Sequence, residues 1–106
     1  MITVTICRES SFVRSFRIEG HAGYADEGYD IICSAVSVLA INTVNSIETF
    51  TDDRFSAKQS DGCLYFRFES EPSKASGLLT DSMILGLTQI QKDYGDAYIK
   101  IEYEEV

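Results

Sequence analysis

Residues 34–50 predict an α-helix with one apolar side, and such a side has to be covered by another layer of the protein. The apolar residues that recur at helical spacing in this segment are Val36, Ala40, Val44 and Ile47. The segments before and after it alternate between apolar and polar residues with a period of two, which is typical of half-buried strands. We therefore expect the helix to pack on a β-sheet.

Five segments carry this alternation, namely 2–7, 12–19, 54–59, 63–69 and 97–103. Short turn sequences join the first two segments and the next two, which predicts two antiparallel hairpins. A second helix is expected between Pro72, which a first helical turn tolerates, and Gly95, a residue type that often follows a helix end. The order β-β-α-β-β-α-β predicts an α+β domain with two helices packed on a mainly antiparallel sheet.

Two apolar patterns indicate which sides of these elements are buried. In segment 12–19, the residues that fall on one side are Phe12, Arg14, Phe16 and Ile18. In the second helix, the apolar stripe consists of Leu78, Leu79, Met83, Leu87 and Ile90. We expect this stripe to be core rather than a binding groove.

The chain carries a net charge of −8, from nine lysines and arginines against seventeen aspartates and glutamates. Such a surface repels phosphate backbones, so we expect no direct nucleic-acid binding, and it would attract a basic partner. The alternative is that the charge only keeps the protein soluble.

At 106 residues the chain is long enough for one core, and we expect a single domain over 1–106.

Three cysteines, Cys7, Cys33 and Cys63, form no closely spaced pair, and the N-terminal segment reaches Arg8 and Glu9 before a long apolar run can form. These features predict a reduced, cytoplasmic protein without a signal peptide.

No stretch approaches the ~20 apolar residues of a membrane span, so we expect no membrane contact. Cys7 and Cys63 are expected to be buried in strands. One histidine and three scattered cysteines lack zinc-site spacing, and we expect neither a metal nor a cofactor.

His21 and Cys33 are the candidate catalytic residues. A thiol has a pKa of about 8.5 in model peptides, and it becomes a good nucleophile when a base and a helix N-terminus stabilise its thiolate. We expect the chain to leave the sheet at Gly20 and residues 21–32 to form a loop that brings the imidazole back to the thiol. Cys33 would then lie in the first helical turn, where free N–H groups favour an anion. The alternatives are a small buried cysteine and a structural histidine.

The expected loop contains residues with more than one interpretation. Gly23, Gly28 and Asp30 oppose regular structure. Tyr24 and Tyr29 are either packed lids or substrate contacts. Asp30 is either a cap at the helix entrance or a carboxylate that orients the imidazole.

The stretch GHAGYADEGYDIICSAVS, residues 20–37, resembles the signature of the bacterial ribosomal-processing cysteine proteases, the Prp family. That signature is a Gly-His-Ala, a loop with glycine, then Asp, two aliphatic residues, Cys, two small residues, an aliphatic residue and Ser. The matching residues are Gly20, His21, Ala22, Gly28, Asp30, Ile31, Ile32, Cys33, Ser34, Ala35, Val36 and Ser37. The departures are Ser34, where alanine is frequent, and Tyr29 at a variable position.

By this resemblance, His21 is the general base and Cys33 the nucleophile that forms an acyl-enzyme. Possible supporting residues are Asp30, Ser34 and Ser37. The residues of the substrate loop are Gly20, Ala22, Gly23, Tyr24, Gly28 and Tyr29. The backbone amides near Cys33 and Ser34 would stabilise the oxyanion.

The resemblance also implies a partner and an assembly. Prp proteases remove an N-terminal extension from large-subunit ribosomal protein twenty-seven, and members of the family are homodimers. The alternatives for this chain are a non-catalytic ribosome-associated module and an anion-binding protein that uses the glycine loop.

Overall fold

The computed structural model describes the backbone of residues 1–20 and 27–106, and the side chains of residues 1–20 and 31–106. In chain order the elements are β1 (Ile2–Glu9), β2 (Phe12–Glu19), α1 (Glu27–Phe50), β3 (Phe55–Ser60), β4 (Cys63–Phe68), α2 (Lys74–Tyr94) and β5 (Ile99–Glu105). The predicted order β-β-α-β-β-α-β and the predicted α+β class are confirmed. Strand ends differ from the predicted ones by one or two residues.

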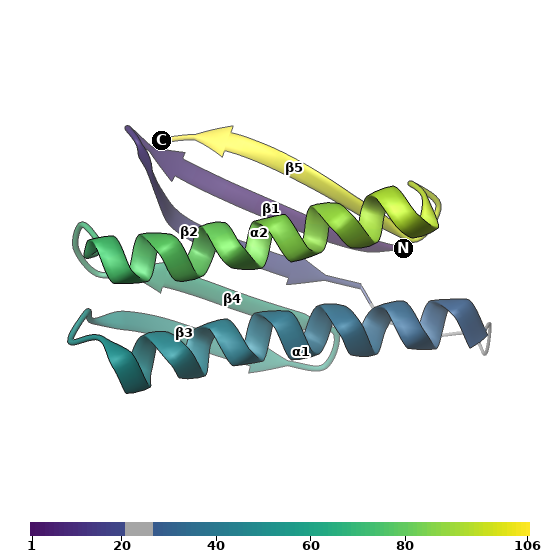
Figure 1. Cartoon of the computed structure of the whole chain (residues 1–106), viewed down its shortest axis with the longest axis horizontal. Helices are drawn as coiled ribbons and strands as arrows, with labels where there is room; N and C mark the ends of the chain where they lie inside the picture. Colours follow the sequence, from purple (N-terminus) through teal and green to yellow (C-terminus); the bar gives the residue numbers. More distant parts are fainter. Residues whose placement is uncertain (21–26) are drawn as a thin grey trace.

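The five strands lie side by side in the order β3-β4-β2-β1-β5. Neighbouring strands are antiparallel except β1 and β5, which are parallel. Figure 1 shows α1 and α2 next to each other in front of the same face of the sheet. Within the described residues no helix covers the opposite face, so the core lies between the sheet and the two helices.

The core confirms the alternation predicted for the first strand, because Ile2, Val4 and Ile6 are all buried. In the middle of the sheet, the ring of Phe66 in β4 stacks on the ring of Phe16 in β2, with centroids 4.9 Å apart. Such aromatic pairs contribute about 0.5–1.5 kcal/mol beyond the area that they bury. Both helices pack against the core that these side chains form.

A bulge interrupts the alternation of β2. The register between β1 and β2 shifts near the start of β2, where Arg14 is the extra residue. Val13 and Phe16 are both buried, which strict alternation does not allow. The prediction of one continuous side from Phe12 to Ile18 is therefore wrong for the first half of the strand, because a bulge changes which side the following residues face.

The second helix packs mainly through the stripe predicted for it. The stripe residues in contact with the core are Leu79, Met83, Leu87 and Ile90. Leu78 is 70% exposed, so its place in the predicted stripe is wrong. Thr80 is buried instead, and its hydroxyl donates a hydrogen bond to the carbonyl oxygen of Gly77, which satisfies the polar group.

Hydrogen bonds fix both ends of α2. The hydroxyl of Ser73 accepts a hydrogen bond from the N–H of Ser76 and caps the start of the helix. Gly95, with a φ of 93°, donates its N–H to the carbonyl oxygen of Gln91 at 2.8 Å. The predicted end of the helix at Gly95 is confirmed.

Asp53 connects the segment after α1 to the start of α2. Its carboxylate accepts hydrogen bonds from the N–H of Ser73, at 3.0 Å, and from the hydroxyls of Ser73 and Ser76. Partial burial raises the pKa of Asp53, but the hydrogen bonds from Ser73 and Ser76 outweigh it, so that this pKa lies below its ordinary value. The negative charge also complements the positive end of the helix dipole.

The first helix begins earlier than predicted, at Glu27 rather than near Ile32. Residues 27–32 are therefore helical, and the prediction of a loop over 21–32 is wrong for its second half. The predicted apolar side is confirmed, with Val36, Ala40 and Ile47 buried and Val44 half-buried.

Much of the remaining surface of α1 is uncharged and exposed. Residues 31–47 contain no charged side chain, and Ile31–Phe50 is long and apolar enough to cross a membrane by length and composition alone. The expectation that no stretch approaches such a span is therefore wrong. In the structure one side of this segment is part of the core. Only 28% of the most apolar 18-residue stretch within it is buried. The helix thus packs through one side and leaves other apolar side chains open.

Candidate active site

The chain leaves the sheet at Gly20, as predicted. Its φ of 114° lies in the region that favours glycine, and a Cβ at this position would clash with the carbonyl oxygen of Met1. The N–H of Gly20 donates a hydrogen bond of 2.9 Å to the carbonyl oxygen of Gly62, in the turn between β3 and β4. The end of β2 is therefore held beside this turn, and the next residue in the chain is His21.

Cys33 lies inside α1, six residues after Glu27 at the start of the helix. The expectation that Cys33 occupies the first turn is wrong, because the helix extends through Gly28 and Asp30 despite their low helix propensity. Beyond the first turn, each helical N–H donates to the carbonyl oxygen four residues earlier. Regular helix geometry engages the amides of Cys33 and Ser34 within α1, which does not favour their expected role at the oxyanion, and this role stays a prediction.

A cavity of about 220 Å³ lies beside Cys33. Its lining includes Ile18, Gly20, Cys33, Ser37 and Gly62. Cys33 is half-buried here and also packs against the core. The cavity is shared by the helix that carries the thiol and by the strand end that precedes His21, and these are the two elements on which the sequence analysis placed its candidate site.

The predicted supporting residues differ in position. Ser37 lies one turn after Cys33 and lines the same cavity, whereas Ser34 is exposed and is not among the described lining residues. Asp30 lies within α1, so its interpretation as a cap at the helix start is wrong. Of Ser34 and Ser37, whose side chains the structure describes, Ser37 is the one that lines the cavity.

Several predicted site residues fall outside what the structure describes. They are His21, Ala22, Gly23 and Tyr24, together with the side chains of Gly28, Tyr29 and Asp30. The contact between His21 and Cys33, the roles of the two tyrosines and the ordering of the substrate loop therefore stay predictions.

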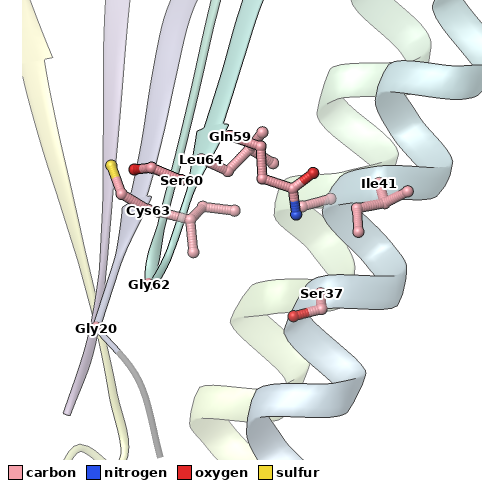
Figure 2. A pocket seen from close by; sticks show the side chains of 10 residues that line it. Gly20, Ser37, Ile41, Gln59, Ser60, Gly62, Cys63 and Leu64 are labelled. Atoms are coloured by element: carbon pink, nitrogen blue, oxygen red, sulfur yellow. The ribbon is translucent and has the colours of Figure 1, made fainter.

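The other two cysteines, Cys7 and Cys63, are half-buried, so the expectation that they are buried is wrong. Cys63 follows Gly62 and contributes to a second cavity that also includes Ser37. Figure 2 shows the sulfur of Cys63 pointing away from α1. Cys63 is therefore a thiol close to the candidate site whose sulfur is directed elsewhere, which makes it a suitable control for Cys33.

The second cavity has a volume of about 120 Å³ and was not predicted from the sequence. Figure 2 shows Ser37 and Ile41 of α1 on one side of it and Gln59 and Ser60 of β3 on the other. One signal was present in the sequence. Ile41 is apolar but lies outside the stripe that α1 buries, which indicates a contact that the core does not explain.

Carboxylates gather at the other end of the molecule, where Glu48, Asp52, Asp53 and Glu69 line a further cavity. Within the part of the chain whose side chains are described, no three His, Cys, Asp or Glu residues lie close enough to hold a metal ion. This acidic cavity is separate from the one beside Cys33.

The sequence pattern of the family described as Cysteine protease Prp matches residues 1–100 of this chain. The chain belongs to this family. The resemblance found in residues 20–37 is thereby confirmed, and membership of the Prp family makes the protein a cysteine protease.

Individual Prp proteins agree with this over nearly their whole length. The ribosomal processing cysteine protease Prp of Bacillus subtilis is 30% identical over 103 residues, which cover 91% of this chain and 92% of the relative. The crystal structure of the ribosomal processing protease Prp from S. aureus with a substrate peptide has a TM-score of 0.90 at 26% identity, covering 98% of this chain and 100% of that chain. The same S. aureus protease with a covalently linked product peptide has a TM-score of 0.88 at 27% identity, with the same coverage.

Proposed function

We propose that this protein is an endopeptidase that removes the N-terminal extension from large-subunit ribosomal protein twenty-seven of its own organism. The observation that carries the proposal is a single cavity lined both by Cys33 and by Gly20, the residue before His21, in a chain of the Prp family. The relatives named for ribosomal processing support the substrate class, and the S. aureus structure with a substrate peptide supports peptide binding by this fold.

In the proposed reaction, His21 accepts the proton of the Cys33 thiol, and the thiolate attacks the carbonyl carbon of the scissile bond. The tetrahedral intermediate collapses to a thioester on Cys33 while His21 gives its proton to the leaving amine. A water molecule then loses a proton to His21 and attacks the thioester. Release of the carboxylic acid returns the proton to the sulfur and restores the thiol.

Asp30 is proposed to orient His21, now that its role as a cap is excluded. Asp30 precedes Cys33 by three residues within α1, and positions three apart are neighbours on a helix surface. A carboxylate that holds the imidazole in one tautomer makes it a better base. Asp30→Asn should therefore lose most of the cleavage rate, and near-normal cleavage by this variant would contradict the role. The hydroxyl of Ser37 is proposed to support the same site from the cavity wall.

We also propose a two-fold homodimer in the cytoplasm, with a net charge of −8 per chain that attracts a basic ribosomal tail. The support for a protein contact is that α1 exposes Ile31 and Val38 within a segment that has no charged residue. Light scattering at micromolar concentration should give twice the 11.8 kDa mass of the chain. A stable monomer would remove the dimer from the proposal.

Alkylation by iodoacetamide at neutral pH separates this function from the alternative of a non-catalytic module. In a protease, Cys33 should react much faster than Cys63, and the rate should fall when His21 is replaced by alanine. In a non-catalytic module, Cys33 should react no faster than the other two cysteines, because all three are half-buried. Peptide mapping by mass spectrometry after short exposure gives the three rates separately.

A further inference from the structure

Three adjoining cavities form one continuous groove that starts at Cys33. The cavity beside Cys33 shares Ile18, Gly20, Ser37 and Gly62 with the second cavity. The second cavity shares Ile41, Gln59 and Leu64 with a third, which has a volume of about 190 Å³. We call this feature the α1–β3 groove, because one wall is the side of α1 from Cys33 to Val44 and the other is the end of β3 with its turn.

The groove is long enough for several residues of an extended peptide. Cys33 and Ile41 are eight residues apart in α1, which corresponds to about 12 Å along the helix axis. An extended chain advances about 3.3 Å per residue. The far pocket therefore lies about three to four peptide residues away from a bond held at the Cys33 sulfur.

Four of the residues that line the far pocket are apolar, namely Ile41, Val44, Ala57 and Leu64. The others are polar, namely Asn45, Lys58 and Gln59. Ile41 is 39% exposed, although most isoleucines of this fold are buried or half-buried. Exposed apolar groups that converge on one pocket lose contact with water when an apolar side chain enters, and this favours binding.

The strand beside the pocket is the free edge of the sheet. Among the described strands, β3 pairs only with β4, so its outer backbone N–H and C=O groups have no partner strand (Figure 1). Ala57 pairs with the buried Phe66, and Gln59 pairs with Leu64, yet both Ala57 and Gln59 are exposed. The helix layer therefore does not cover the end of β3, and an edge strand of this kind can accept another strand.

We propose, on the basis of the function proposed above, that the substrate binds in the α1–β3 groove as an extended strand along the edge of β3. An apolar side chain three to four residues from the scissile bond enters the pocket formed by Ile41, Val44, Ala57 and Leu64. This pocket, rather than the cavity at Cys33 alone, selects which bond is cleaved.

Ile41→Asp tests the pocket, with Leu85→Asp as the matched control. Both changes place a carboxylate on an exposed apolar position of a helix, but Leu85 is on α2 and is 71% exposed. With a synthetic peptide that spans the cleaved bond, Ile41→Asp should lower kcat/KM by about tenfold or more, mainly through KM. The control should lower it less than twofold, and the alkylation rate of Cys33 should be unchanged in both variants. Equal kinetics for Ile41→Asp and the control would overturn the proposal.

Substitution along the peptide tests the distance. Each apolar residue on either side of the scissile bond is replaced by asparagine, one at a time. One position three to four residues from the bond should lose about tenfold in kcat/KM with the wild-type enzyme, and this loss should shrink to less than threefold with Ile41→Asp. A loss confined to the residues next to the bond would overturn the proposal. Absence of any cleavage by the wild-type protein would instead contradict the function on which it rests.

Discussion

The two helices lie on the same face of the sheet and have similar lengths, 24 residues in α1 and 21 in α2, but they are built differently. The second helix has a serine cap, a glycine end and the Asp53 carboxylate at its start. Its charged residues are Lys74, Asp81, Lys92 and Asp93. The first helix has no charged residue over 31–47, and one of its sides borders the α1–β3 groove.

This difference separates a helix that supports the fold from the helix that contains the proposed nucleophile. Local hydrogen bonds fix both ends of α2, and its four charged residues are exposed. Apolar side chains such as Ile31 and Val38 of α1 remain largely exposed in the isolated chain, and they favour contact with a substrate or a second protein. Changes on the exposed side of α1 should therefore alter catalysis with little effect on stability, whereas changes on the buried side of α2 should alter stability.

The largest effect is expected at Cys33. Cys33→Ala should abolish cleavage of the ribosomal substrate while the fold remains intact, because one small side chain is removed at a partly open cavity. Cys33→Ser should also be nearly inactive, since a hydroxyl ionises far less readily than a thiol. Cys7→Ala is the control, because Cys7 is a half-buried thiol outside the groove, and it should cleave at close to the wild-type rate. Product formation is followed by mass spectrometry, and folding by circular dichroism.

His21→Ala should reduce kcat by about 10²–10⁴-fold, the usual contribution of a general base. It should also raise the pH at which the alkylation rate of Cys33 reaches half of its maximum, because the thiolate loses its stabilising partner. The measurement is the rate of iodoacetamide labelling from about pH 5 to about pH 10, a range that spans the ordinary thiol pKa of about 8.5. An unchanged pH profile would mean that His21 is structural.

In α2, Met83→Ala should lower the free energy of unfolding by about 2–5 kcal/mol, because Met83 is 2% exposed and its loss leaves a cavity. The matched control Leu85→Ala, at a position 71% exposed, should change it by less than about 0.5 kcal/mol. Urea denaturation gives both values. The kcat of the folded enzyme should be the same in both variants, and a large change of kcat in Met83→Ala would break the distinction between the two helices.

Asp53→Asn should have a smaller effect, a loss of about 1–2 kcal/mol in unfolding free energy at pH 7, because a charged acceptor of hydrogen bonds is replaced by a neutral one. The pKa of Asp53 is lower in the folded protein, so its stabilising contribution is fully present above the unfolded-state pKa of about 3.9. That contribution disappears as the pH falls through the lower folded-state pKa.

The difference in stability between wild type and Asp53→Asn should therefore be constant near neutral pH and shrink in acid. Urea titrations at several pH values measure it. Asp52→Asn serves as the control, since Asp52 is an exposed neighbour in the same segment. A difference for Asp53→Asn that does not depend on pH would mean that the carboxylate charge is not what holds the start of α2.

Element order was predictable because periodicity is a local property of the sequence. The alternation in β1 and the stripe in α1 each required only neighbouring residues. The early start of α1 was not predictable in this way, because Gly28 and Asp30 have low intrinsic helix propensity. The bulge at Arg14 was hidden as well, since a register shift depends on the partner strand.

The site was predictable only in part. The distinctive stretch around His21 and Cys33 identified the family, and the structure brings Gly20 and Cys33 to one cavity. The α1–β3 groove was not predictable, because it depends on how far α1 extends over β3. The exposure of Ala57, for example, is set by this packing and not by the residues next to it.

The most direct test is to incubate the purified protein with the unprocessed large-subunit ribosomal protein twenty-seven of the same organism and to measure the product masses. The wild-type protein should remove one N-terminal segment at a single bond, and Cys33→Ala should leave the substrate intact. Cleavage by Cys33→Ala at the wild-type rate would show that Cys33 is not the nucleophile, and an intact substrate after incubation with the wild type would contradict the proposed processing.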